Sequence, residues 1–525
     1  MKKWSGYRHE ICQESFDTII IGSGMSGLTA AVLLSQYGQR VLVLEKHFKA
    51  GGFTHTFTRK KYEWDVGIHY IGEVHKTKSH IRKLFDRITD GNLQWAKMDD
   101  NYDRIIFPDQ SYDFVAPKEK LIDILIGHFP EEKKAINDYI SLLESYVKSG
   151  RGYFASKALP KWLTPFLYRS MTKPFFEYAD RMTKDVLREF TQNEKLLGVL
   201  TGQWGDHGSP PGRSSFAMHA MVARHYLDGG NYPVGGSRMI AEYATDEIEK
   251  HGGKVVVNAG VDEILTKGKK AVGVRLENGD ELFASKVISS AGLMNTVNTF
   301  LRHQSSGEMF KEKMKTVRPT ESYLCLYMGL NKTAKELGFK NTNLWIYPGY
   351  DHDQNVEKFR TNPNGEFPVV YVSFPSAKDP EWDKNHPGCA TMEAITLGPW
   401  DQFKAWKDEP WQGRGESYEA LKDSLSKKIL DVVYKHVPQA EGAMDYYELS
   451  TPLSVRNMAN YPIGEMYGLD HTPERFHQKW LRPQTDIKNL YLTGQDVTTV
   501  GLTSALFSGL LTASSVLGKN LIKTL

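Results

Sequence analysis

The sequence of 525 residues is poor in cysteine. Its three cysteines, Cys12, Cys325 and Cys389, lie far apart, and none belongs to a C-x-x-C pair. The sequence therefore predicts no zinc cluster, no disulfide framework and no dithiol that could relay electrons. Because unpaired thiols are typical of a reducing compartment, we expect a cytoplasmic protein.

Long hydrophobic runs are also missing. The longest weakly polar segment, Ala505 to Leu517, contains Ser, Thr and Gly and is shorter than the roughly 20 apolar residues that span a bilayer. Residues Met1 to Cys12 are polar and do not contain the apolar core of a signal peptide. These features predict a protein that is not integral to a membrane.

Neither sign of charge is in excess. Lys and Arg number 66 against 63 Asp and Glu, so the formal net charge is +3. No block of basic residues approaches the charge of a nucleic-acid site, and we expect no nucleic-acid partner. The hydrophobic share of 40% is that of a globular chain, and at about 150 residues per domain the length predicts two to four domains.

Residues 153–178 interleave aromatic and basic side chains. Trp162 and Phe166 alternate there with Lys157 and Lys161. A stretch of this kind could lie on a membrane surface, which makes it a candidate docking segment for a peripheral membrane protein. It could equally form a pair of helices that cover a core and leave their lysines in water.

Near its start, the chain has the pattern of a strand, a turn, a helix and a second strand. Phe16 to Ile21, FDTIII, is a β-branched run of strand length, and Val41 to Leu44 is a second such run. The Ala- and Leu-rich stretch between them has helical spacing and ends at Gly38. The turn that joins the first strand to this helix is a G-x-G-x-x-G sequence at Gly22, Gly24 and Gly27.

This turn has the features of a dinucleotide site. Gly22 permits the tight bend, Gly24 leaves room for a pyrophosphate against the backbone, and Gly27 lets helix and strand pack closely. The helix N-terminus offers unpaired N–H groups to the phosphates. Glu45, about 20 residues further on, can accept hydrogen bonds from both ribose hydroxyls and would repel a 2′-phosphate. The pattern therefore predicts FAD or NAD and disfavours NADP.

A second turn, near the other end of the chain, favours FAD. Gly494-Gln495-Asp496 follows a buried run, and a helix of small residues begins a few positions later. FAD is long and needs both of its ends held, so we expect Asp496 to bind the ribityl hydroxyls. The helix that begins around Leu502 and Thr503 would direct its N-terminus at the flavin and stabilise the reduced anion.

The remaining elements are predicted from hydrophobic periodicity and turn signals. Asn278-Gly279 predicts a hairpin between strands at 271–276 and 281–284. Further strands are predicted at 254–258, 286–290, 323–330, 368–374 and 489–493, and helices at 118–126, 131–147, 239–251 and 417–433.

A second G-x-G-x-x-G is absent from the middle of the chain. A built-in nicotinamide domain of the disulfide-reductase type is therefore not expected. The flavin would be reduced by its substrate, by a separate electron donor or by freely docking NAD(P)H.

Three blocks of the sequence resemble one family. The block FDTIIIGSGMSGLTAAVLLSQYGQRVLVLEKH, with the following AGGFTHTF and WDVGIHYIG, resembles the opening of the FAD-dependent superfamily of phytoene desaturases, carotenoid isomerases and retinol saturases. The segment from Gly205 to Ser237 and the C-terminal block NLYLTGQDVTTVGLTSALFSGLL are similar to the retinol saturase branch.

The resemblance implies an α/β fold, in which a FAD-binding Rossmann-like domain of the glutathione-reductase type carries an interleaved α+β substrate domain. It implies a discontinuous FAD domain of residues 12–95, 225–300 and 480–525, and a substrate domain of residues 96–224 and 301–479. Residues that match FAD-binding positions of the family are Gly22, Gly24, Ser26, Gly27, Glu45, Lys46, Gly52, Gly494 and Asp496, with Val261 at the adenine edge; Gly51, Leu502 and Thr503 complete the predicted set.

The implied activity is that of a FAD-dependent oxidoreductase acting on the CH–CH groups of a lipophilic polyene, such as a retinoid, a carotenoid or an unsaturated lipid. The predicted reaction saturates one double bond with a hydride from reduced flavin and a proton. A proton donor must lie within hydrogen-bond reach, directly or through one water. Because they lie in blocks that resemble flavin-proximal segments of the family, His69, Tyr70 and Tyr232 are predicted candidates.

Other functions stay open at this point. The same chemistry could isomerise or desaturate a polyene. A related fold serves prenyl-lipid escort proteins, which bind lipid chains without catalysis, but the turn at Gly494 to Asp496 argues against that class because an escort needs no ribityl contacts. An amine oxidase is disfavoured because no aromatic-cage motif is recognisable.

Overall fold

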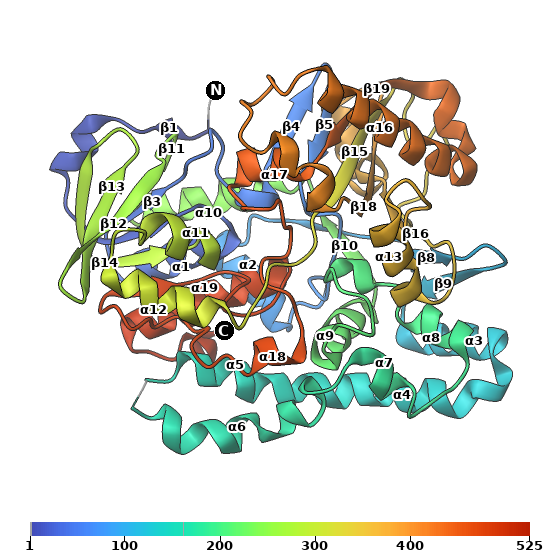
Figure 1. Ribbon diagram of the computed structural model, residues 1–525, viewed down its shortest axis with the longest axis horizontal. Coiled ribbons are helices and arrows are strands. Elements are labelled where there is room, and N and C mark those ends of the chain that lie inside the picture. The colour runs from blue at the N-terminus through green and yellow to red at the C-terminus, as the bar shows by residue number, and fades with distance from the viewer. Residues whose placement is uncertain (1–2, 161) are drawn as a thin grey trace.

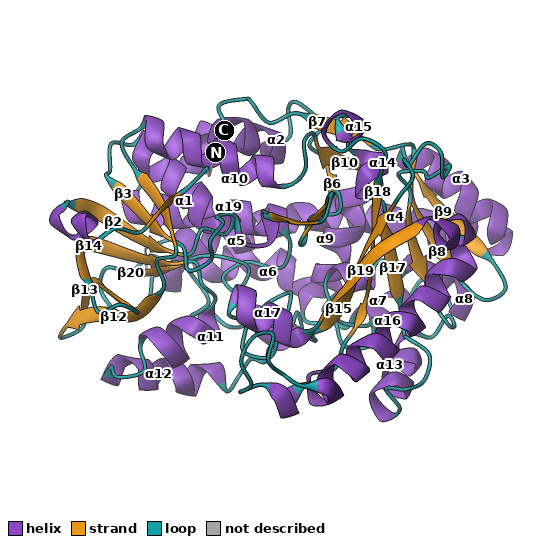
Figure 2. Cartoon of the chain, turned by 90° about the horizontal axis from the view of Figure 1, so that it is seen from above, coloured by secondary structure: helices purple, strands orange, loops and turns teal. Residues whose placement is uncertain are grey.

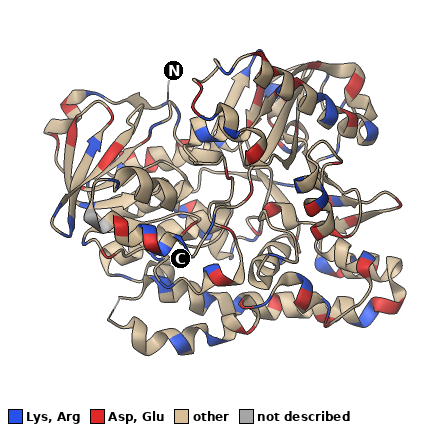
Figure 3. Ribbon diagram, viewed as in Figure 1, with Lys and Arg blue, Asp and Glu red and all other residues tan. Residues whose placement is uncertain are grey.

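The computed structural model describes residues 3–160 and 162–525 (Figure 1). Two large sheets stand at opposite sides of the molecule, and helices fill the space between them (Figure 2). Basic and acidic residues are interspersed along the whole ribbon (Figure 3), in keeping with the balanced charge.

The first sheet has the strand order β1-β11-β3-β2-β14-β13-β12, and β20 pairs with β14. Its pairs are parallel from β1 to β14 and from β14 to β20, whereas β13 is antiparallel to both of its neighbours, β12 and β14. The strands span Ser5–Gly6 (β1), Phe16–Ile21 (β2), Val41–Leu44 (β3), Lys254–Val257 (β11), Val261–Lys267 (β12), Lys270–Leu276 (β13), Glu281–Ser289 (β14) and Leu490–Leu492 (β20).

Both faces of this sheet are buried, which explains the continuous apolar runs of its strands. Ile20 and Val43 enter one core, where the helices α1 (Met25–Gln36), α10 (Arg238–Lys250) and α19 (Leu502–Leu517) pack. Their neighbours Ile19 and Leu42 enter another core on the opposite face, with residues of β12 and β13.

The hairpin predicted at Asn278-Gly279 is confirmed, because β13 pairs antiparallel with β14 and Gly279 has a φ of +92°. The prediction of two separate strands beyond it is wrong. Residues 281–289 form one strand, whose first part pairs with β13 and whose last part pairs with β2 and β20. The polar stretch around Ser285 indicated a break between two strands. The strand nevertheless continues through this stretch, and Ser285 Oγ donates to the Asp17 carbonyl oxygen.

The second sheet has the order β19-β15-β18-β17-β16-β8-β9. All of its pairs are antiparallel except that of β8 with β16. Every residue of β15 and β18 is buried, so these strands form the middle of a core. The strands span Asn101–Ile106 (β8), Ser111–Val115 (β9), Tyr323–Leu330 (β15), Asn343–Ile346 (β16), Val370–Ser373 (β17), Ala390–Leu397 (β18) and Met444–Ser450 (β19).

Short strands and helices connect and cover the sheets. A hairpin of β4 and β5 packs into the core of the second sheet, and the helices α4, α5 and α6 run along the lower edge of Figure 1. Their bounds are Thr56–Arg59 (β4), Tyr62–Asp65 (β5), Ile71–Gly72 (β6), Trp95–Lys97 (β7), Gly230–Pro233 (β10), His80–Ile88 (α2), Lys118–His128 (α3), Lys133–Tyr146 (α4), Gly150–Ala158 (α5), Thr164–Ala179 (α6), Thr183–Leu187 (α7), Glu194–Leu200 (α8), Phe216–Tyr226 (α9), Ser305–Met314 (α12), His352–Thr361 (α13), Pro375–Lys378 (α14), Glu416–His436 (α16) and Pro452–Ala459 (α17).

The chain passes between the two sheets several times. Strands of the first sheet come from residues 5–44, 254–289 and 490–492, and those of the second from 101–115 and 323–450. The exact domain boundaries given above stay a prediction.

Candidate cofactor and active site

The turn from β2 to α1 has a shape that requires glycine. Gly22 has a φ of +93°, and a Cβ at Gly27 would lie 2.3 Å from the Gly22 carbonyl oxygen. Gly24 lines a cavity, and a Cβ there would meet only Ser290 Oγ, at 3.9 Å, among the described atoms within 4 Å. The missing side chain leaves an open cradle at the N-terminus of α1, which suits a pyrophosphate.

The two glycines after β3 close over this turn. Gly51 forms a parallel bridge with Gly24 and has a φ of +119°. A Cβ on Gly52 would lie 3.0 Å from the Gly24 Cα. A larger residue at Gly52 would therefore push into the cradle, whereas one at Gly51 would collide with Thr54 and Ala241.

Glu45 lies directly after β3 and lines the same cavity. Its Oε2 accepts hydrogen bonds from Ser23 N (2.9 Å) and Ser23 Oγ (2.6 Å), and its Oε1 accepts one from His47 N (2.8 Å). These bonds fix the carboxylate at the rim of the turn. Because Oε1 accepts only one of these bonds, it has a further lone pair that can accept a bond from a ribose hydroxyl.

The C-terminal part of the chain supplies the other side of the cavity. Gly494 follows β20 with a φ of +112°, and Asp496 comes two residues later. Asp496 Oδ1 accepts from Leu469 N (3.0 Å) and its Oδ2 from Leu293 N (2.7 Å). The carboxylate is thus held by two backbone amides at the cavity wall.

The start of α19 opens onto the cavity. Gly501, the N-cap residue, has a φ of +98° and offers no side chain, so the first-turn N–H groups have no side-chain cap. Gly501 and Leu502 line the cavity. The hydroxyl of Thr503 is buried and has no hydrogen-bond partner within the described residues. A helix start of this kind favours negative charge, as on a reduced flavin.

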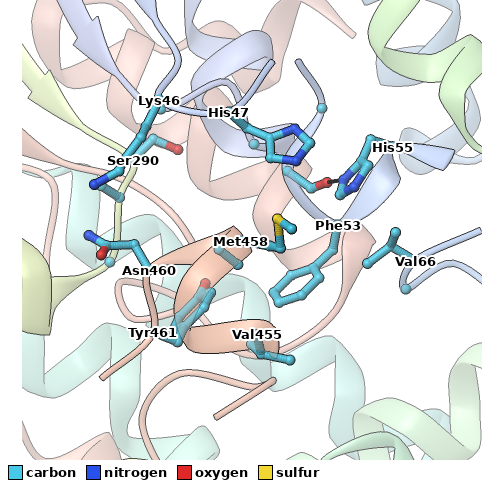
Figure 4. Close-up of a pocket in the computed structure, with 18 of the residues that line it drawn as sticks. Lys46, His47, Phe53, His55, Val66, Ser290, Val455, Met458, Asn460 and Tyr461 are labelled. Carbon is cyan, nitrogen blue, oxygen red and sulfur yellow. Dashed lines mark hydrogen bonds between the residues drawn. The ribbon is translucent and has the colours of Figure 1, made fainter. Parts of the chain in front are cut away.

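These segments enclose one cavity of about 440 Å³ (Figure 4). Gly27 and Thr503 are the two residues of the predicted set that do not line it. The predicted residues that line it are Gly22, Gly24, Ser26, Glu45, Lys46, Gly51, Gly52, Val261, Gly494, Asp496 and Leu502.

Other lining residues were not predicted. Phe53, Met458 and Tyr461 gather in the middle of Figure 4, and the rings of Phe53 and Tyr461 stack at 5.6 Å. The hydroxyls of Ser290 and Ser26 form a hydrogen bond of 2.8 Å. Ser290 is the last residue of the strand predicted at 286–290, and this position at a strand end could have indicated that it lines the site. The end of α17, which provides Met458, carries no motif that indicates a site.

The cavity continues toward the second sheet. There it is lined by Phe57 of β4 and Tyr327 of β15, whose rings meet edge to face at 4.7 Å. Trp411, Val455 and Met458 extend this mainly apolar wall. The FAD-type turns and an aromatic chamber therefore share one space.

The three predicted proton donors lie outside the lining, although the preceding residues 66–68 belong to it. The Nδ1 of His69 lies 2.7 Å from Glu393 Oε2. The Tyr70 hydroxyl donates to Asp103 (3.0 Å) and Asp206 (3.1 Å). Tyr232, in β10, donates to the buried Asp65 and borders a separate small pocket. Their predicted roles stay predictions.

These residues belong to a buried set of titratable groups. Burial raises the pKa of the Asp65 and Asp103 carboxyls to about 6 each, and that of Asp206 well above its ordinary range. Burial lowers the pKa of the Lys378 ammonium to about 7. These carboxyls therefore keep their protons to a higher pH than exposed carboxyls do, and Lys378 loses its proton at a lower pH than an exposed lysine does.

Within the segment of residues 153–178, residues 153–158 belong to α5 and residues 164–178 to α6. Trp162 and Phe166 are 70% and 78% exposed, but Lys157 is buried and donates to the Leu481 carbonyl (2.6 Å). The expectation that Lys157 belongs to an exposed basic face is wrong, because its ammonium lies over the Tyr153 ring and bonds the Leu481 carbonyl in the interior. Lys161 lies outside the described residues.

The cradle, the carboxylate after β3 and the open start of α19 define a flavin-binding protein of the Rossmann type. The sequence comparisons agree. Residues 25–296 match the family of flavin containing amine oxidoreductases. An all-trans-retinol 13,14-reductase of Danio rerio is 36% identical over 97% of this chain and 87% of its own length. The chain therefore belongs to the flavin containing amine oxidoreductase family, in the branch of the all-trans-retinol 13,14-reductases.

Less similar relatives carry the names of the wider predicted superfamily, and solved structures show the same fold. A prolycopene isomerase of an Oncidium hybrid (84% of this chain, 73% of the relative) and a phytoene desaturase of Rhodobacter capsulatus (95% and 93%) are each 26% identical. The fold matches an oxidoreductase from Methanosarcina mazei with a TM-score of 0.64 at 15% identity, over 96% of this chain and 100% of that one. It matches a putrescine oxidase with a TM-score of 0.61 at 14% identity, over the same shares.

The predicted superfamily, fold class and cofactor are thereby confirmed. The protein is a FAD-dependent oxidoreductase that acts on CH–CH groups. Among the described residues, no helix is both long enough and apolar enough to cross a membrane.

Proposed function

We propose that the protein saturates one double bond of a retinoid or a similar lipophilic polyene. The observation that carries this proposal is the single cavity in which the FAD-type turns meet the aromatic chamber at Phe57 and Tyr327. A flat conjugated chain fits such a chamber, because aromatic walls contact it on its faces and edges. Two relatives that are 36% and 35% identical and are named as retinol reductases support the same substrate class.

Residues of this chain would hold the cofactor at both of its ends. We assign the pyrophosphate to the turn at Gly22 to Gly27, the ribose to Glu45, and the ribityl chain to Asp496. The adenine edge would meet Val261, and the flavin ring the start of α19. When bound, FAD supplies the hydride in its reduced form.

The outer end of the chamber is polar. Arg59 Nε donates to Glu448 Oε2 (3.0 Å), and both side chains are partly exposed and line the cavity. We infer that the polar end of an amphipathic substrate faces this pair, because a hydroxyl can bond there without being buried. The apolar chain would then extend inward past Phe57.

Electrons must come from outside the chain. We propose a separate electron donor or freely docking NAD(P)H, since the sequence has one G-x-G-x-x-G and the three cysteines are free thiols.

The free thiols also support a cytoplasmic location. A lipophilic substrate supports contact with a membrane surface, and we propose that Trp162, Phe166 and Leu167 make that contact.

Isomerisation and desaturation are the nearest alternatives, and two relatives are named for those reactions. Anaerobic reduction of the flavoprotein, followed by incubation with polyene alcohols, carotenoids and unsaturated fatty acids, separates them by product mass. The proposal requires a product two hydrogens heavier than the substrate. An unchanged mass would establish an isomerase, and a product two hydrogens lighter a desaturase. A protein that binds lipid but no flavin would be an escort protein.

A further inference from the structure

A row of polar side chains crosses the second sheet from the cavity wall into the protein interior. In the strand register, Tyr327 of β15 stands opposite Glu393 of β18, which stands opposite Ser373 of β17. Asn343 of β16 stands opposite Asp103 of β8, and Asn343 Nδ2 donates to Asp103 Oδ1 (2.9 Å). Residues that stand opposite one another project from the same face with their Cβ atoms about 5 Å apart.

Tyr327 is the member of this row that lines the cavity. Its hydroxyl lies 3.5 Å from the Val66 carbonyl oxygen and also bonds the Cys325 thiol, and since the first contact is long and sulfur is a weak acceptor, a better acceptor can take the proton. The two histidines of the cavity wall do not compete for this role, because burial lowers the pKa of His47 and lowers that of His55 to about 4. Both are neutral at neutral pH.

Glu393 lies behind Tyr327 and is fully buried, with 0% exposure. Neither of its carboxyl oxygens has a well-aligned hydrogen bond within the part of the chain that the structure describes. Its nearest basic atom is His69 Nδ1, at 2.7 Å. At this distance a proton can pass directly between the carboxyl oxygen and the imidazole nitrogen.

The other groups around Glu393 are also titratable. Lys378, at the end of α14, donates to the His69 carbonyl (2.9 Å) and to Ser373 Oγ (2.7 Å). Asp65 of β5, Cys325 of β15 and Lys378 are each coupled electrostatically to Glu393. The interior thus offers a store of protons behind one wall of the cavity.

We propose that the Tyr327 hydroxyl donates the proton that completes reduction of the substrate double bond, and that Glu393 and His69 return a proton to it. This rests on the function proposed above. One carbon of the double bond receives the hydride. The Tyr327 O–H bond breaks, and its proton bonds to the neighbouring carbon. The phenolate then takes a proton from the Glu393–His69 pair, and the buried ammonium of Lys378, which is coupled electrostatically to Glu393, restores a proton to that pair. His69 is in this account a positioning and proton-supplying residue, and Tyr327 is the catalytic one.

Tyr327→Phe and Tyr323→Phe form a matched pair of variants for the test. Tyr323 lies four residues earlier on β15, and its hydroxyl is buried, has no hydrogen-bond partner among the described residues and does not line the cavity. We expect Tyr327→Phe to bind FAD normally and to reduce ferricyanide at the wild-type rate, since that acceptor needs no proton. We expect its anaerobic reoxidation by the polyene to slow at least about 100-fold, with the solvent deuterium effect changed. Tyr323→Phe should behave as the wild type.

The outcomes separate the two proposals. If the wild type reduces the polyene and Tyr327→Phe reduces it as fast as Tyr323→Phe does, Tyr327 is not the proton donor, and the proposed function stands. If the flavin-loaded wild type reduces no polyene, both are overturned. Infrared spectra of the protein in H₂O and D₂O test the proton store without turnover. At neutral pH, Glu393→Gln should remove either a protonated-carboxyl band or the imidazolium band of His69. If the variant keeps both bands, the proposed proton store behind Tyr327 is overturned.

Discussion

Gly509, in the last helix, packs directly against the Ser26 carbonyl of the first helix, where a Cβ would lie 2.5 Å from the oxygen. The two residues are separated by nearly the whole chain and are brought together because α1 and α19 share one core. Next to this contact, Gly494 lies beside Ser26 at the cavity wall, with the position of its Cβ 3.5 Å from Ser26 Oγ. The packing of the two helices therefore brings the N-terminal and C-terminal turns of the proposed FAD site together.

Gly509→Ala should damage this contact. The added methyl group has no room, and overpacking of this kind costs about 1–3 kcal/mol. We expect a lower melting temperature and weaker retention of FAD on gel filtration. Gly127→Ala is the control, because Gly127 is an exposed helical glycine whose Cβ would meet nothing within 4 Å. Equal melting temperatures and equal flavin content in the two variants would contradict the packing argument.

Glu45→Gln should weaken FAD binding with little change in fold. A glutamine removes the charge and places an amide opposite Ser23 N or His47 N, and a hydrogen bond to a charged group contributes about 1.5–3 kcal/mol. Titration of the apoprotein with FAD, followed by flavin fluorescence, should show a roughly ten- to hundredfold higher Kd. Glu281→Gln is the control, since Glu281 forms an exposed pair with Arg275 away from the cavity. Identical Kd values would remove Glu45 from the site.

Local sequence signals predicted the first sheet well. The runs at Phe16 to Ile21 and Val41 to Leu44 match β2 and β3, because strands buried on both faces must be apolar without interruption. The second sheet was predicted only in part. Strands such as β8 and β16 are short and carry polar residues, including Asp103 and Asn343, which bond to one another inside the core. Such pairing across about 240 positions leaves no local pattern.

The candidate site was predictable where a turn requires glycine and was not predictable elsewhere. Gly22 and Gly494 have backbone angles that glycine adopts without strain, so the sequence marks them. Tyr461 and Tyr327 enter the cavity because of how α17 and β15 are packed, and nothing in their neighbouring residues indicates this. The position of His69 outside the lining is also a consequence of the tertiary structure.

Lys157 should make stability depend on pH. Burial lowers the pKa of its ammonium from the ordinary 10.5 to about 7. Between these values the unfolded chain binds a proton that the folded protein does not, so the free energy of unfolding rises with pH in that range. Denaturant unfolding at pH 7 and pH 10 should show that Lys157→Met lowers this rise by up to about 4 kcal/mol. The exposed control Lys173→Met should keep the wild-type rise, and a rise equal in both variants would contradict the burial of Lys157.

The exposed apolar residues before and within α6 should carry membrane binding. Trp162 and Phe166 are exposed next to Arg169 and Lys173, which suits an anionic lipid surface. Replacing both aromatics with serine should lower binding to vesicles of mixed neutral and anionic lipids at least about tenfold, since each buried aromatic contributes about 1.5–3 kcal/mol. Phe283→Ser is the control, because Phe283 is 57% exposed on β14, in the first sheet. Unchanged vesicle binding of the double variant would exclude this surface.

The most direct test of the account is the flavin content of the purified full-length chain. Heat denaturation followed by chromatography of the released nucleotide should yield one FAD per chain, because both ends of the polypeptide line one cavity of the required chemistry. A colourless protein that releases no flavin, and that takes up none when FAD is added to the folded chain, would contradict the central claim.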